Sequence, residues 1–98
     1  MLTGVFQATK KDGTIYYRSN ITYRSKHISL GSFPLETEAH QAYLEADHLL
    51  QNADITIDHV GFSDYLLHPE KIVTLLNFRD NHIYIKNHRF TARILPVK

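Results

Sequence analysis

The chain has 98 residues, of which 43% are hydrophobic and 11% aromatic, so it is long enough for one domain and too apolar for a disordered segment. It has no cysteine, which excludes disulfides and thiolate metal sites, and no run of roughly 18 apolar residues, which excludes a membrane span. Its start has no signal-peptide pattern, and we expect a cytoplasmic protein. The formal net charge of +1 hides three bands: residues 1–33 contain five basic residues and one acidic residue, residues 34–64 contain seven acidic residues and no basic one, and residues 65–98 contain six basic and two acidic residues.

The first part of the chain has the composition of short β-strands. LTGVFQAT is followed by the turn signal KKDG and then by TIYYRSNITYR, in which β-branched and aromatic residues alternate with polar ones. A second reversal near Ser25-Lys26 leads to HISLGSF, whose Ile28 and Leu30 again alternate with polar neighbours. The pattern predicts a three-stranded antiparallel sheet in meander order.

Alternation along these strands assigns their side chains to two faces, because successive residues of a strand point to opposite sides. The more apolar face contains Tyr17, Ser19, Ile21, Tyr23, Ile28 and Leu30. The other face is polar and basic and contains Tyr16, Arg18, Asn20, Thr22, Arg24, His27 and Ser29. We expect the first face to cover the core and the second to meet solvent.

From Leu35 to about Gln51 the apolar residues recur at spacings of three and four, which predicts one amphipathic helix. Its apolar stripe is formed by Ala39, Ala42, Tyr43, Ala46, Leu49 and Leu50. Alanines on this stripe allow the helix to lie close to the sheet. Glu36 and Glu38 in the first turn are favoured there by the helix dipole.

Beyond Asn52 the pattern is weaker. A strand over ADITIDHV that ends at Gly61, a short helix capped by Ser63 and a second helix from Pro69 through Phe78 are expected. HIYIK and RFTARIL around Asn87-His88 predict a carboxy-terminal hairpin. Its outward residues form a possible second basic surface: Tyr84, Lys86, Arg89 and Arg93. The whole is an α+β fold in which residues 1–51 form the sheet and helix and residues 52–98 form an α/β extension packed on them as one compact unit.

Four short motifs occur in a characteristic order. They are Gly4-Val5, Tyr17-x-Ser19-x-Ile21, Lys26-His27-Ile28-x-Leu30-Gly31-x-Phe33 and Glu38-Ala39-x-x-Ala42-Tyr43-x-x-Ala46. Over residues 4–46 the chain resembles the Apetala-two/ethylene-response-factor type of DNA-binding domain, and most of all its bacterial and phage versions, which occur beside integrases and homing endonucleases. The resemblance implies a sheet that lies in the DNA major groove and touches bases and phosphates with its outer face.

Position by position, the resemblance implies a set of DNA-facing residues. They are Phe6, Tyr16, Arg18, Asn20, Thr22, Arg24, His27 and Ser29 on the sheet, with Lys10, Lys11 and Lys26 at turns near the phosphates. Arginine pairs bidentately with guanine and asparagine with adenine, so Arg18 and Asn20 are the candidates for base readout. In the family, arginines or other long polar residues usually stand where this chain has Phe6 and Ala8, and a capping threonine stands where it has Leu35.

The expected partner is therefore double-stranded DNA, and the expected role is that of a small phage or mobile-element regulator without cofactor or metal. A basic segment beside an acidic one suits a polyanion, but also a surface that is balanced internally. The alternative function is a protein-interaction or inhibitor module that binds a nuclease or another nucleic-acid-handling protein. RNA binding is a minor variant, and the oligomeric state is open.

An enzymatic function is not expected. Asp58-His59, Asn77 or Asn81, and His82 or His88 follow the residue order of an HNH nuclease. The asparagine-rich loop of such nucleases is absent, however, and an apolar helix is predicted in its place. No metal-binding HExxH motif, nucleophile motif or phosphate-binding loop occurs.

Overall fold

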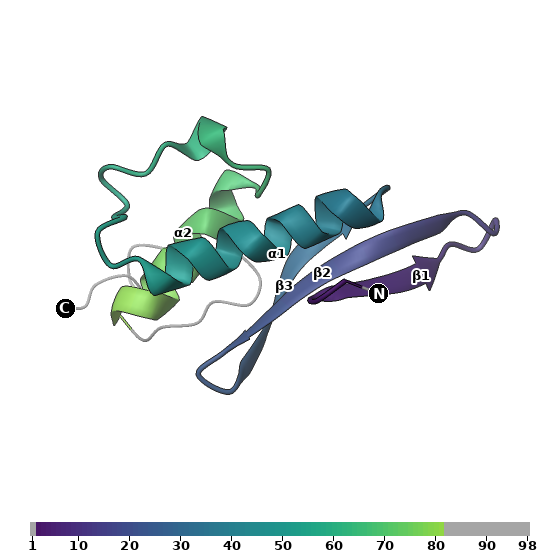
Figure 1. Cartoon of the computed structure of the whole chain (residues 1–98), viewed down its shortest axis with the longest axis horizontal. Coiled ribbons are helices and arrows are strands. Elements are labelled where there is room, and N and C mark those ends of the chain that lie inside the picture. Colours follow the sequence, from purple (N-terminus) through teal and green to yellow (C-terminus); the bar gives the residue numbers. More distant parts are fainter. Residues whose placement is uncertain (1, 82–98) are drawn as a thin grey trace.

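A computed structural model describes residues 2–81 of the protein. The predicted carboxy-terminal hairpin, with Tyr84, Lys86, Arg89 and Arg93, lies outside the described residues. Three strands open the chain, β1 (Val5–Thr9), β2 (Ile15–Tyr23) and β3 (Lys26–Phe33), and they are followed by α1 (Glu36–Gln51), a 3-10 helix η1 (Phe62–Asp64) and α2 (Pro69–Asn81). Figure 1 shows α1 lying along one face of the sheet, with α2 beside its end. The α+β class expected from the sequence is confirmed.

The three strands form an antiparallel meander in the order β1-β2-β3, as the sequence predicts. The turn between β2 and β3 consists of Arg24 and Ser25, whose φ angles are 50° and 68°. Two-residue hairpin turns with positive φ at both residues are favoured because their twist matches the right-handed twist of the strands. Between Ser19 and Asn20 the β2-β3 register shifts by one residue, so that Leu30 has no partner and forms a β-bulge. Ile28 and Leu30 both remain buried on the inner face.

α1 packs closely on this inner face because its contact stripe is made of small residues. Ala39, Ala42 and Ala46 are all completely buried, and Ser19 of β2 is buried as well. The helix begins at Glu36 with Leu35 in the N-cap position and no side-chain cap, as the missing threonine predicts. Glu36 and Glu38 in its first turn compensate in part, because negative charge is favoured at the positive end of the helix dipole.

Two expectations for the middle of the chain are wrong. Residues 53–60, expected as a strand, form turns instead, and within residues 2–81 no other segment pairs with them. Their backbone finds partners by other means, since the carbonyl of Ile55 accepts a hydrogen bond from the Arg79 side chain. Ser63 does not cap a helix but lies inside η1, which follows Gly61. The alternation of Ile55 and Ile57 does not indicate a strand here, because Ile55 packs against the core from a turn segment and Ile57 is exposed.

α2 runs from Pro69 to Asn81, three residues beyond the expected end at Phe78. Its apolar side, Ile72, Leu75, Leu76 and Phe78, joins the core formed by the sheet and α1. The turn before it is tied to α1 by the Glu45 carboxylate, which accepts hydrogen bonds from the backbone N–H groups of Leu66 and Leu67 at 2.9 and 3.1 Å. Within residues 2–81, no helix combines the length and apolar character needed to cross a membrane.

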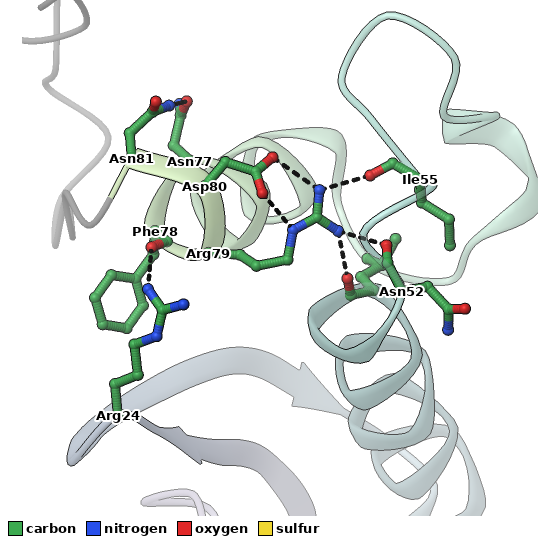
Figure 2. A network of polar contacts seen from close by, with 9 residues as sticks. Arg24, Asn52, Ile55, Asn77, Phe78, Arg79, Asp80 and Asn81 are labelled. Carbon is green, nitrogen blue, oxygen red and sulfur yellow. Dashed lines mark hydrogen bonds and ion pairs between the residues drawn. The ribbon is translucent and has the colours of Figure 1, made fainter.

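The buried side chain of Arg79 joins α2 to the end of α1 (Figure 2). Its guanidinium donates to the carbonyls of Leu49, Asn52 and Ile55, each at 2.7 Å, and forms a two-pronged ion pair with the carboxylate of Asp80. These contacts use all five N–H groups of the guanidinium. The hydrogen bonds that Arg79 donates to the Asp80 carboxylate raise the pKa of Arg79 above its ordinary, already high value. Arg79 therefore supplies donors to one carbonyl in the last turn of α1, that of Leu49, and to two carbonyls of the segment that follows the helix.

Candidate nucleic-acid interface

The outer face of the sheet lies opposite the helices, and no described helix covers it (Figure 1). Its side chains form three columns, one on each strand, with partners fixed by the register. On β1, Phe6 faces Arg18 and Ala8 faces Tyr16. On the other side of β2, Arg18 pairs with Ser32, Asn20 with Ser29 and Thr22 with His27. The structure thus brings together most of the residues that the sequence analysis assigned to this face.

Arg18 occupies the middle of the face and is exposed to solvent. Its Nη2 donates a hydrogen bond to the hydroxyl of Tyr16 at 3.1 Å, and its guanidinium carbon lies 5.8 Å from the centre of the Tyr16 ring. The Nζ of Lys10 approaches the same ring at 5.9 Å. Tyr16 therefore limits the freedom of the Arg18 side chain while leaving most of its N–H donors directed at solvent.

The far end of the face is occupied by Asn20, Thr22 and His27. The hydroxyl of Thr22 lies 3.0 Å from Nδ1 of His27, so the two side chains are joined across the strands. Asn20 is half-buried, and its backbone N–H donates to the carbonyl of Gly4 at 2.9 Å. Ser29 beside it is exposed. This end of the face is polar.

The predicted phosphate-contacting lysines lie at both ends of the sheet and are exposed. Lys10 and Lys11 belong to the turn between β1 and β2, and Lys26 begins β3 beyond the other turn. Nine residues of β2 separate the two ends, which is roughly 30 Å at the usual rise of a strand. Asp12 shapes the first turn, because its Oδ1 accepts a hydrogen bond from the backbone N–H of Thr14 at 2.9 Å, which lowers the pKa of this carboxyl.

The first two charge bands of the sequence lie on two sides of the molecule. The basic first band forms the sheet, whereas the acidic residues of the second band all belong to α1 and the segment that follows it. In Figure 1 this segment passes on the far side of α1 from the sheet. A polyanion that approaches the outer face therefore meets positive charge first and is separated from most of the acidic residues by the sheet itself.

Arg24 is placed differently from the sequence expectation. It lies in the hairpin turn rather than on the strand face, and its guanidinium turns toward α2, where Nη1 donates to the carbonyl of Phe78 at 3.3 Å (Figure 2). The guanidinium carbon also lies 4.8 Å from the centre of the Tyr23 ring. Strand alternation assigned Arg24 to the outer face, but the positive φ angle of the turn ends that alternation. Arg24 therefore helps to hold the hairpin against α2.

The residues considered for a nuclease do not assemble into a site in the described part of the chain. Asn77 is buried, and its side-chain oxygen accepts a hydrogen bond from Asn81 at 3.1 Å. The Nδ1 of His59 forms a hydrogen bond of 3.0 Å with the hydroxyl of Thr56. Over the same range, no three His, Asp or Glu side chains gather in an arrangement that could hold a metal ion.

Comparison of the chain with protein-family models, with curated proteins and with solved structures finds no match. The residues of the outer face and their geometry are therefore the basis for a functional proposal.

Proposed function

We propose that the protein is a small DNA-binding protein that places the outer face of its sheet in the major groove and serves as a regulator in a phage or mobile element. One observation carries the proposal: an exposed arginine, Arg18, is held by Tyr16 at the centre of a polar face that no helix within residues 2–81 covers. The resemblance of residues 4–46 to an Apetala-two type of domain supports the same use of this face.

The side chains of the face suit the chemistry of the groove. The guanidinium of Arg18 has the fork geometry that matches O6 and N7 of guanine, and the amide of Asn20 matches N6 and N7 of adenine. Two residues along a strand are separated by roughly 6.6 Å, about two base-pair steps, so both can reach bases of one site. Lys10, Lys11 and Lys26 extend at the ends of the sheet, where they meet phosphates that fix the position of the protein without reading sequence.

The proposal is tested by titrating labelled duplex DNA with the full-length chain at several salt concentrations. We expect the logarithm of the affinity to fall with the logarithm of the salt concentration, with a slope of about −0.9 for each phosphate contacted. Arg18→Ala should weaken binding by about 1–3 kcal/mol, because a bidentate contact to a base is lost.

Arg24→Ala provides a matched control, since it also removes a guanidinium, but from the hairpin turn at the end of β2. Its side chain is directed at α2 and contacts Phe78, so its loss should weaken DNA binding much less than the loss of Arg18. Affinity that does not respond to salt, or an equal loss in the two variants, would contradict the proposed role of the outer face.

A protein partner is the second candidate, and a specific observation favours it. β1 carries no charge on the outer face, and Phe6 there is 56% exposed, as an aromatic anchor for a protein pocket would be. A protein that ignores duplex DNA at low salt but binds a nuclease through Phe6 would act as an inhibitor module. The same titration, followed by a binding assay with purified nucleases, separates the two functions.

A further inference from the structure

Phe6 is an apolar ring on a polar face. It is 56% exposed, whereas its neighbour Val5 is 4% exposed, because the two side chains point to opposite sides of the sheet. The ring of Phe6 is therefore not part of the core. It presents apolar surface on the outer face of the sheet, on the strand next to the one that carries Arg18.

The register places these two side chains directly opposite each other. Directly opposite residues on neighbouring antiparallel strands have Cβ atoms about 5 Å apart, which is close enough for both side chains to touch one ligand. Along β1 the outer column consists of Phe6 and Ala8, which have only hydrocarbon side chains, whereas every outer residue of β2 carries a hydrogen-bonding group. The apolar outer residues of β1 therefore lie beside the hydrogen-bonding outer residues of β2.

The major groove of DNA offers a match for this pairing. Guanine presents the O6 and N7 acceptors that arginine grips, and the apolar group displayed in the groove is the methyl group on C5 of thymine. Methylation of cytosine at C5 places the same group in the same position. Successive base pairs are about 3.4 Å apart, so a side chain about 5 Å from Arg18 reaches the base pair next to the guanine.

We propose that Phe6 and Arg18 together recognise a guanine that is adjacent to a 5-methylpyrimidine, with Arg18 on the guanine and Phe6 against the methyl group. This specificity rests on the proposed DNA binding and adds the chemical class of the site. It also gives a reason for a phenylalanine where the domains that residues 4–46 resemble usually have arginine or another long polar residue: a polar contact is replaced by a methyl contact.

The test begins with selection of binding sites from a random duplex library by the full-length protein. We expect the enriched duplexes to share a thymine beside a guanine. In one selected duplex that thymine is then replaced by deoxyuridine, which removes only the methyl group and keeps every hydrogen-bonding group. Affinity should fall about three- to fivefold, the factor expected for one buried methyl group.

Two further duplexes carry cytosine or 5-methylcytosine at the same position. We expect 5-methylcytosine to bind more tightly than cytosine by a similar factor, since only the methyl group differs between them. Whichever of the thymine and 5-methylcytosine duplexes binds more tightly identifies the source of the methyl group in the natural site.

Variants connect the methyl effect to one side chain. Phe6→Ala should bind the thymine and deoxyuridine duplexes equally, while Phe6→Leu should retain part of the difference because an aliphatic side chain still contacts a methyl group. Leu44→Ala is the matched control, since Leu44 is an apolar residue of α1 with 45% exposure, on the other side of the sheet. It should leave the preference unchanged.

The results separate this inference from the proposed function. Equal affinity of the unaltered protein for thymine and deoxyuridine, or a preference that survives in Phe6→Ala, overturns the methyl contact while DNA binding through Arg18 stands. Enrichment of no duplex, together with binding that does not depend on Arg18, overturns the proposed function and the inference with it.

Discussion

The two sides of the sheet use arginine in opposite ways. On the helix side, Arg79 is 7% exposed, and all five of its N–H groups have acceptors in α1, the loop after it and Asp80. On the outer side, Arg18 is exposed and donates to Tyr16 alone among the described residues. A guanidinium whose donors are all used is a structural element, whereas one held in place with donors left over is available to a ligand.

The sharpest test of this contrast is a pair of identical substitutions. Arg79→Met removes the donors of three backbone carbonyls and leaves Asp80 without its ion-pair partner. We expect a loss of about 3 kcal/mol or more in the free energy of unfolding, measured by urea denaturation. For a domain with a total stability of about 5–15 kcal/mol, this is a large fraction.

Arg18→Met completes the pair. Because the Arg18 side chain is exposed, its replacement should change the free energy of unfolding by no more than about 0.5 kcal/mol. Similar destabilisation by the two substitutions would remove the distinction between a structural and an available arginine.

A second prediction concerns how closely the first strand approaches α1. Gly4 has a φ of +78°, and a Cβ atom there would overlap the ring of Tyr43 and lie 2.9 Å from the carbonyl oxygen of Asn20. Gly4→Ala should therefore destabilise the protein by about 2–3 kcal/mol in thermal or urea unfolding, through backbone strain and overpacking together.

Gly13 provides the control for that substitution. Its φ is +92°, but a Cβ atom would have no heavy atom within 4 Å, so Gly13→Ala tests the strain without the overlap. The cost should be about 1 kcal/mol. If the two alanine variants were equally stable, contact with Tyr43 would not explain the glycine at position 4.

The smallest expected effect is a pH dependence of the turn beside Lys10 and Lys11. The Thr14 N–H holds the pKa of Asp12 below its ordinary value, so this carboxylate stabilises the turn at pH above about 4. The contribution is lost as the pH falls through the lowered pKa of the folded state. The amide resonance of Thr14, followed by NMR during acidification, should report the change, and Asp12→Asn should abolish it because an amide does not titrate in this range.

Local patterns were a good guide where neighbouring residues decide the structure. The strands were predicted because Ile28 and Leu30 alternate with polar residues, and α1 because its alanines recur at helical spacing. The pattern failed at Ile55 and Ile57, where the side chains alternate but no strand within residues 2–81 pairs with the segment. A strand needs a partner for its backbone, and the presence of that partner is not a property of the segment itself.

The candidate site shows the same division. Arg18, Asn20, Thr22 and His27 were assigned to one face from alternation alone, and the register places them there. Arg24 was not predictable in this way, because the two-residue turn reverses the chain at that residue and directs its side chain to Phe78. The role of Arg79 was not predictable from the sequence, since its three backbone acceptors lie 24 to 30 residues earlier in the chain.

The sequence by itself determined the secondary structure of the first half of the chain, the separation of apolar from polar faces and the charge bands, because these depend on neighbours within a turn or a strand. The tertiary structure alone decided which arginine is buried and which is exposed, that Phe6 stands opposite Arg18, and that the acidic band lies behind the sheet. These outcomes depend on contacts between residues distant in the chain, which form only when the elements pack together.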